Sequence, residues 1–262
     1  MLPYWDWTFD SQDPISSPIF EPEYLGIEVG PQGDCSWRMR VPRTHCLVRN
    51  YDPEDMGTFH SATVIDGLVT RRSTYDQFRS GLEISPHGNV HVVVGGSGGD
   101  MSRMQSPNDP LFWLHHGFVD KIWADRQKNT RNTNQYDGRF GGRTVSLTDI
   151  MAPFNKPASA GFSTTDLCYR YQPFSQRMTS SGLEVIPEKE VQGTIKAPKP
   201  LPDEWIHMLG LPVEQVRAME QELNDMIPVP PVVKAKEEGT GNSASHLQPV
   251  LYLSLALFIL LC

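Results

Sequence analysis

The sequence predicts a mainly α fold with loop-rich segments and a C-terminal extension. Three local patterns favour this fold class. Asn108-Asp109-Pro110 combines a polar cap with a proline, the usual start of a helix, and opens a run to about residue 128. Apolar residues at helical spacing mark another helix, at Tyr75, Phe78 and Leu82. An amphipathic helix in the C-terminal extension is marked by Val213, Val216, Met219, Leu223 and Met226.

The bulk composition is that of an ordinary globular protein. The chain has 262 residues, of which 39% are hydrophobic and 21% charged, enough for one sizeable core. Its formal net charge is −8, and lysines and arginines do not cluster. Because nucleic-acid affinity rests largely on cationic contacts to phosphates, we expect no nucleic-acid partner.

The helical part begins after a long irregular segment. Residues 1–60 are rich in Pro, Gly and aromatic residues without a sustained period, so we expect loops around short pieces. Thr74 and Gln77 fit a capping box for the helix that follows. Ser85-Pro86 predicts the start of a second helix, ending at Gly95-Gly96. Valines at 90 and 92–94 suit a buried strand equally well, so periodicity leaves this element open.

Four segments follow from these patterns. Residues 1–172 form the main domain, closed by a polar, glycine-containing loop region from 129 to 172. Residues 173–227 are the C-terminal extension, and 228–249 have the Pro, Gly and charged composition of a linker. Residues 250–262 are an uncharged apolar tail, shorter than the ~20 residues that a spanning helix needs.

The cysteines and the tail bear on location. Cys35 and Cys46 could close a small loop in an oxidising compartment or remain free thiols in a reducing one. Small residues at 239–244 before the tail give the layout of a signal for a GPI-type lipid anchor. We therefore expect secretion with display at the cell surface. The first residues lack the basic and apolar regions of a signal peptide, so we also expect that the natural N-terminus lies upstream of Met1. A short peptide anchor and a buried core helix are the alternatives.

Two pairs of histidines are candidates for metal binding. His87 and His91 are four residues apart, so on a helix their imidazoles project from one face. His115 and His116 lie on the helix that follows Asp109, and adjacent helical residues point about 100° apart, so one of them would complete the site. Imidazole suits copper, zinc, iron and nickel alike, so spacing does not identify the metal.

Longer motifs resemble a known family. Residues 86–96, which begin Pro-His-Gly-Asn-Val-His, together with 108–123, Asn-Asp-Pro-Leu-Phe-Trp-Leu-His-His-Gly-Phe-Val-Asp-Lys-Ile-Trp, resemble the second copper motif of tyrosinases, catechol oxidases and hemocyanins. Residues 2–8, Leu-Pro-Tyr-Trp-Asp-Trp-Thr, resemble the segment that follows that family's first copper motif. Residues 169–171, Tyr-Arg-Tyr, resemble the motif that closes the central domain.

The resemblance implies a four-helix-bundle copper domain in which two coppers, each held by three histidines, bind oxygen between them. His87, His91 and His116 would hold the second copper, with His115 a neighbour. Asp120 would accept a hydrogen bond that orients a ligand imidazole. Glu83 is the candidate catalytic residue, because many relatives place a glutamate there to hold an active-site water. Relatives that hydroxylate monophenols often carry asparagine where this chain has Gly88, which favours diphenol oxidation here.

The implied function is a copper-dependent oxidoreductase that oxidises o-diphenols to o-quinones with dioxygen, with monophenols left open as substrates. The first copper motif would lie upstream of Leu2, so we expect a truncated or fragmentary form that supplies ligands for one copper. In such a form Trp5 and Trp7 would be exposed. The alternative is a non-catalytic, mononuclear copper-binding surface protein.

Overall fold

The computed structural model describes residues 1–26, 35, 37–128, 134–172, 176–179, 182–185 and 194–228. Residues 1–171 and 195–228 belong to one compact unit, and the described residues between 172 and 194 belong to a second unit. No helix within the described ranges is long and apolar enough to cross a membrane. The predicted apolar tail, and the predicted linker after Pro228, lie outside the described residues. The predicted segment boundaries therefore stay predictions.

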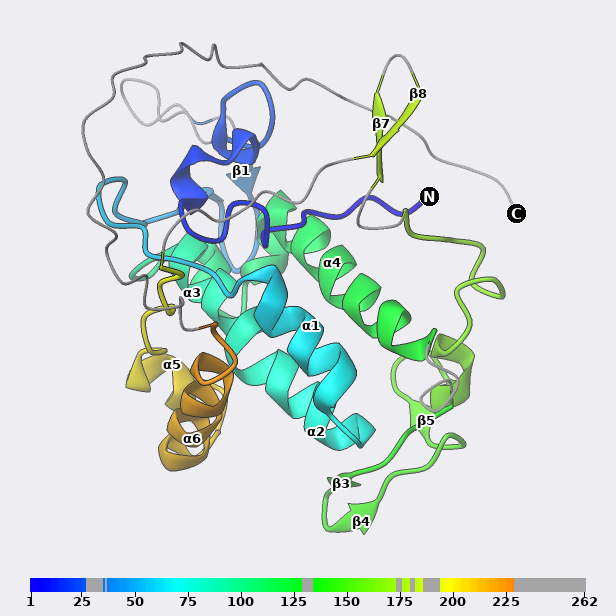
Figure 1. Cartoon of the computed structure of the whole chain (residues 1–262). Coiled ribbons are helices and arrows are strands. Elements are labelled where there is room, and N and C mark those ends of the chain that lie inside the picture. Colours follow the sequence, from blue (N-terminus) through cyan, green and yellow to red (C-terminus); the bar gives the residue numbers. More distant parts are fainter. Residues whose placement is uncertain are drawn as a thin grey trace, which may run out of the picture. The chain divides into compact units, whose positions relative to one another are not determined.

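Helices dominate the first unit, which confirms the mainly α fold class (Figure 1). Helix α1 (Ala62–Arg71) packs against α2 (Tyr75–Leu82) and against α4 (Pro110–Gln127). The chain continues from α2 through η4 (Glu83–His87) into α3 (Gly88–Gly95). Two short 3-10 turns, η5 (Asp100–Ser102) and η6 (Ser106–Asn108), lead into α4. The sequence patterns did not predict α1.

The N-terminal segment is irregular, as predicted. Its short elements are the 3-10 turns η1 (Pro14–Ser16) and η2 (Pro18–Phe20) and the paired strands β1 (Arg38–Met39) and β2 (His45–Cys46). Cys35 and Cys46 form a disulfide, which decides between the two alternatives for these residues.

The prediction that Trp5 and Trp7 are exposed is wrong. Both indoles are buried, with 6% and 0% of their surface exposed, and both pack edge-to-face on Phe59. The backbone N–H of Trp5 donates to the carbonyl of Leu114 at 3.0 Å, so this segment runs beside α4. Burial of these rings therefore follows from contacts within the chain.

Residues 75–95 form one continuous helical arm, and the predicted break at Ser85-Pro86 is wrong. Thr74 caps the arm as expected, accepting from the N–H of Gln77 at 3.2 Å. Pro86 lies inside η4, a single π-helical turn between two α-helical stretches. A π turn spaces its hydrogen bonds differently from an α-helix, which accommodates a residue that has no N–H to donate. The arm ends at Gly95, and the valine-rich stretch is helical.

The start of α4 is confirmed at the expected residues. Asp109 is the N-cap, and its carboxylate accepts from the N–H of Leu111 at 2.8 Å, with Pro110 in the first turn. The same carboxylate is held by two nitrogens of Arg49, each at 2.7 Å. Because both side chains are almost fully buried, the start of α4 is fixed by an ion pair within the core.

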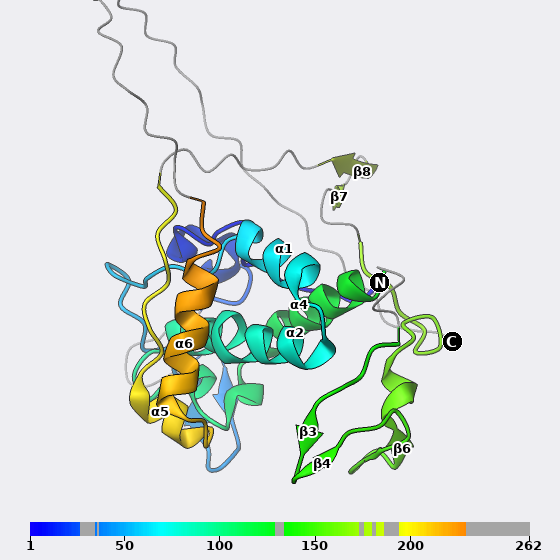
Figure 2. The same ribbon diagram turned by 60° about the horizontal axis from the view of Figure 1, so that its bottom comes forward.

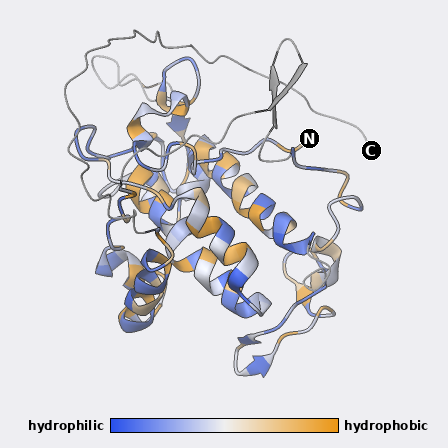
Figure 3. Ribbon diagram, in the orientation of Figure 1, coloured by the Kyte–Doolittle hydropathy of each residue, from blue (hydrophilic) through white to orange (hydrophobic). Residues whose placement is uncertain are grey.

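Within the first unit, residues 195–228 of the C-terminal extension pack against the helical arm (Figure 2). Helix α6 (Val213–Asn224) confirms the predicted amphipathic helix, and a short helix that was not predicted, α5 (Asp203–Met208), precedes it. Figure 3 shows hydrophobic and hydrophilic residues interleaved along α6. The buried face of α5 and α6 joins the arm in a cluster made of Ile84, Leu201, Trp205, Ile206 and Val216. Trp205 lies against Gly88, where an added Cβ would come within 2.7 Å of the indole.

Short hairpins complete the described structure. In the region predicted as loop, β3 (Arg139–Phe140) pairs with β4 (Arg143–Thr144), and β5 (Ile150–Met151) pairs with β6 (Lys156–Pro157). The 3-10 turn η7 (Ala158–Gly161) follows. In the second unit, β7 (Gln176–Thr179) pairs with β8 (Gly182–Val185).

Candidate metal centre

Four histidines converge between the helical arm and α4. One ring nitrogen from each of His87, His91, His115 and His116 lies within 4.8 Å of the others. Nε2 of His91 is 3.1 Å from Nε2 of His87 and 3.3 Å from Nε2 of His116. Imidazole nitrogens that sit about 2.0–2.1 Å from a tetrahedral metal ion are about 3.3 Å apart. The spacing of these three nitrogens therefore fits a common metal ion.

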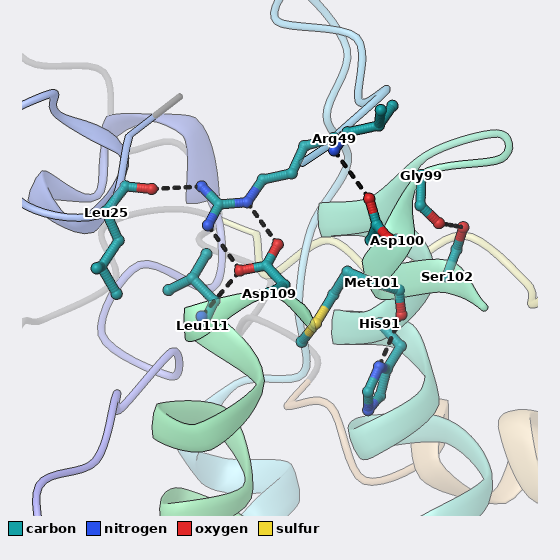
Figure 4. A network of polar contacts seen from close by, with 10 residues as sticks. Leu25, Arg49, His91, Gly99, Asp100, Met101, Ser102, Asp109 and Leu111 are labelled. Atoms are coloured by element: carbon teal, nitrogen blue, oxygen red, sulfur yellow. Dashed lines mark hydrogen bonds and ion pairs between the residues drawn. The ribbon is translucent and has the colours of Figure 1, made fainter. Parts of the chain in front are cut away.

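Backbone carbonyls orient two of these imidazoles. Nδ1 of His87 donates to the carbonyl of Glu83 at 3.0 Å. Nδ1 of His91 donates to the carbonyl of Met101 at 2.8 Å, the bond that Figure 4 shows. A proton held on Nδ1 leaves the lone pair of Nε2 free for a metal. The ring of Phe112 lies next to that of His116, with centroids 4.0 Å apart and the planes tilted by 30°, and limits how that imidazole can turn.

Burial keeps the cluster neutral. It lowers the pKa of His91 to about 3 and that of His116 to about 4, and the neighbouring His87 adds to both shifts. Burial also lowers the pKa of His87. Because only an unprotonated imidazole can bind a metal, these three side chains are ready as ligands at neutral pH without losing a proton.

His115 belongs to the cluster by distance but differs in its hydrogen bonding. Its Nδ1 accepts from the indole Nε1 of Trp7 at 3.1 Å, and its Nε2 is buried with no hydrogen-bond partner among the described residues. The side chain has no exposed surface. Sequence spacing separated His115 from His116 only by helical phase, and it gave no indication that Trp7 bonds to one of them.

Glu83 does not point its carboxylate into the cluster. The side chain is half-exposed and pairs with Arg79 at 2.7 Å, while only its backbone carbonyl reaches His87. Its proposed role in holding a catalytic water stays a prediction.

Asp120 has partners other than the one expected. Instead of orienting an imidazole, its carboxylate accepts from the hydroxyls of Tyr169 and Tyr171 at 2.7 and 2.6 Å. Burial, together with Asp120, raises the pKa of both tyrosines. The two tyrosines thus fasten the end of the loop region to α4.

The segment around residues 45–49 holds both sides of the cluster in place (Figure 4). Asp100 accepts from the N–H of Val48 and contacts Nε2 of His45, both at 2.9 Å, and so fixes the turn whose Met101 carbonyl bonds to His91. Arg49 fixes Asp109 at the start of α4, which carries His116. Because these partners are far apart in the chain, no local pattern pointed to them.

The remaining described histidines play other parts. His45 contacts Asp100, and the ring of His60 is buried with Nε2 at 2.9 Å from the hydroxyl of Ser85. His207 is exposed on α5. Within the described ranges the four-histidine cluster is the only group of three or more His, Cys, Asp or Glu side chains close enough to hold a metal ion. Three converging neutral imidazoles are a donor set that suits copper as well as zinc, iron or nickel.

Comparison with known proteins decides the family. Residues 1–129 match the family model described as the common central domain of tyrosinase. Residues 1–129 therefore form a central domain of the tyrosinase family of type-3 copper proteins. The histidine cluster lies within the matched residues, so copper is the metal to consider first for this site.

Bacterial and fungal members show how far the likeness extends. Tyrosinases from Streptomyces glaucescens and Streptomyces antibioticus are 32% and 30% identical to the chain over 183 and 185 residues. Each match covers 61% of this chain and 65% of the relative. The tyrosinase-like protein phomQ2 from Diaporthe leptostromiformis is 29% identical over 210 residues, covering 65% of this chain and 52% of that protein. The matched part of the chain thus spans just under two thirds of the Streptomyces relatives.

Proposed function

We propose that His87, His91 and His116 bind one copper ion, and that the protein containing this site oxidises o-diphenols to o-quinones with dioxygen. The observation that carries the proposal is the convergence of three Nε2 atoms at 3.1 and 3.3 Å in a central domain of the tyrosinase family. In this family a pair of coppers supplies the binding and reduction of dioxygen. His87, His91 and His116 would bind one of these two copper ions.

The protein orients the three ligand imidazoles toward the metal site and keeps them unprotonated. The carbonyls of Glu83 and Met101 fix two rings, and Phe112 confines the third. Burial makes protonation of these imidazoles unfavourable, because the charged form loses solvation. Copper should therefore compete with protons at the site only in acidic solution.

The preference for diphenols over monophenols rests on residue 88. Relatives that hydroxylate monophenols often carry asparagine there, and Trp205 occupies the space that any side chain at Gly88 would need. This packing supports diphenol oxidation as the proposed activity. Glu83 remains the candidate for holding an active-site water, and its half-exposed carboxylate would have to leave Arg79 to do so.

Copper content of purified variants tests the ligand assignment. Alanine at His87, His91 or His116 should each abolish stoichiometric copper binding, whereas His115→Ala should retain it. His207→Ala is the control, because that histidine is exposed and lies outside the cluster. Loss of copper in His115→Ala with retention in His116→Ala would reverse the assignment.

A second candidate is a mononuclear copper protein without turnover. Oxidation of two diphenols by one dioxygen transfers four electrons, and this family uses two coppers for it. The described residues contain a single histidine cluster, which favours a protein that binds one copper. Copper stoichiometry and oxygen uptake with catechol separate the candidates. Two coppers per protein with catechol oxidation favour the oxidase, and one copper without oxygen uptake favours the second candidate.

For location, we propose secretion with display at the cell surface. The Cys35–Cys46 disulfide is typical of oxidising compartments, and the composition of residues 239–262 favours a lipid-anchor signal. Treatment of intact cells with a GPI-specific phospholipase should then release the protein. Retention of the protein, with Cys262 still present by mass spectrometry, would favour a peptide anchor.

A further inference from the structure

We propose that Trp7 keeps His115 from coordinating the metal by occupying the only nitrogen lone pair that a neutral His115 can offer. The inference rests on the proposed copper site and assigns Trp7 as a positioning residue for it. It also supplies a chemical reason why His116, and not the adjacent His115, completes the set of three ligands.

His115 is close enough to compete for the metal. Its ring centroid lies 5.3 Å from that of His87, 5.0 Å from that of His91 and 5.2 Å from that of His116. One of its nitrogens is within 4.8 Å of a ligating nitrogen on every other member of the cluster. Distance alone therefore does not exclude a fourth imidazole ligand, so something else must do so.

The hydrogen bond from Trp7 settles where the proton of His115 resides. An indole N–H can only donate, so Nδ1 of His115, 3.1 Å away, must be the acceptor. In a neutral imidazole the other nitrogen then carries the proton, which places it on Nε2. With Nδ1 accepting and Nε2 protonated, neither nitrogen has a lone pair free for copper.

Burial makes this arrangement persistent. Neither Trp7 nor His115 has exposed surface, so water cannot replace the bond if it opens. If His115 turned to present Nδ1 to the metal, the Trp7 N–H would be left buried without an acceptor, which is unfavourable. Trp7 is itself held edge-to-face by Phe59 and Phe118, with ring centroids 6.2 and 5.0 Å away.

The chain contains a matched control for the indole N–H. Trp5 is buried and packs on the same Phe59 ring, and its indole Nε1 has no hydrogen-bond partner in the part of the chain that the structure describes. Trp5→Phe and Trp7→Phe both remove an indole from this aromatic cluster. Only Trp7→Phe removes a bond to the histidines.

The tautomer of His115 can be measured in the metal-free full chain by ¹⁵N NMR of the imidazoles, with the His115 signals assigned by their loss in His115→Phe. We expect the Nε2–H tautomer in the unsubstituted chain and in Trp5→Phe. In Trp7→Phe the excess of that tautomer should fall by roughly two- to tenfold, the factor that one ordinary hydrogen bond contributes. An Nδ1–H tautomer in the unsubstituted chain would overturn the inference without any variant having to fold.

Loading with Cu(II) tests the consequence for coordination. Electron paramagnetic resonance should give one copper species in the unsubstituted chain and in Trp5→Phe, and a second species in Trp7→Phe. That second species should disappear in Trp7→Phe/His115→Phe, because the competing imidazole is gone. A single unchanged species in a folded, copper-loaded Trp7→Phe would refute the role of Trp7. Failure of the unsubstituted chain to bind copper would refute the proposed function itself, an outcome that the tautomer measurement distinguishes.

Discussion

The ion pair between Arg49 and Asp109 should be one of the largest single contributions to the stability of the metal centre's frame. Their side chains retain only 1% and 0% exposed surface, and two nitrogens of the guanidinium each contact a different carboxylate oxygen. A third nitrogen of Arg49 donates to the carbonyl of Leu25 at 2.6 Å. The pair therefore joins the N-terminal segment to the start of α4.

Arg49→Met would leave the carboxylate of Asp109 buried with the N–H of Leu111 as its remaining hydrogen-bond partner among the contacts described above. Removing one partner of a buried pair typically costs about 3–5 kcal/mol of unfolding free energy, because a charge is left without compensation. For a protein of this size each kcal/mol lowers the Tm by about 2–4 °C. The expected decrease in Tm is therefore about 6–20 °C.

Calorimetry and urea unfolding of the full chain would measure this loss. Lys199→Met is the matched control, because Lys199 pairs with Asp55 at 2.6 Å but the two side chains are 60% and 67% exposed. An exposed pair contributes about 0–1 kcal/mol, so the control should change the Tm little. Arg49→Met/Asp109→Asn should recover part of the loss, because asparagine still caps α4 and no buried charge remains.

A loss in Arg49→Met no larger than that in Lys199→Met would refute the reasoning, since it would mean that the buried carboxylate finds compensation elsewhere. A double variant less stable than Arg49→Met would also contradict it. In that case the guanidinium would stabilise the frame through Leu25 and packing more than through Asp109.

Three further predictions concern other parts of the first unit. Burial lowers the pKa of His60 to about 4, below its usual 6.5, so between these pH values the unfolded chain binds a proton that the folded chain does not. Lowering the pH from about 6.5 to 4 should therefore reduce the free energy of unfolding by up to about 3 kcal/mol. Urea unfolding at pH 7 and 4.5 should show a smaller acid loss in His60→Gln. Gly88→Asn should weaken the packing of α5 and α6 and so speed their limited proteolysis, because the new side chain and Trp205 compete for one space. The increase in proteolysis should be smaller in a Trp205→Ala background. Asp120→Asn should lower the pKa of its two tyrosine partners, measured by ultraviolet titration.

Local patterns predicted the elements whose signals lie within one or two helical turns. Thr74 and Asp109 were identified as caps because each bonds to an N–H two or three residues along the chain. The i, i+4 spacing likewise placed His87 and His91 on one face. In each case the interaction partner is a neighbour in sequence, so the residue types at that spacing carry the information.

Contacts between distant residues could not be predicted in the same way. Trp7 and His115 are 108 residues apart, and Arg49 and Asp109 are 60 apart. The residue types give no distance between such partners, since many arginines and tryptophans are present. Asp120 illustrates the same limit: its position on a helix near the histidines suggested an imidazole as partner, but the chain returns two tyrosines to it.

Pro86 failed as a boundary signal for a different reason. Proline before a candidate helix usually marks a first turn, but η4 holds it inside a continuous arm. A π turn contains one residue more than an α turn, so a single extra residue can be taken up without rotating the helices on either side.

Because of this property, η4 can absorb a change of one residue in the arm that carries His87 and His91. Removing one residue elsewhere in α2 would turn the following part of the arm by about 100° and carry both imidazoles away from His116. Removing one residue within η4, together with Pro86→Ala, could instead convert the turn to an ordinary α-helical one and leave the flanking helices in phase. Homologues that vary in length by one residue just before this histidine pair could therefore keep the same ligand geometry, so gaps in an alignment at this point would not signal loss of the site.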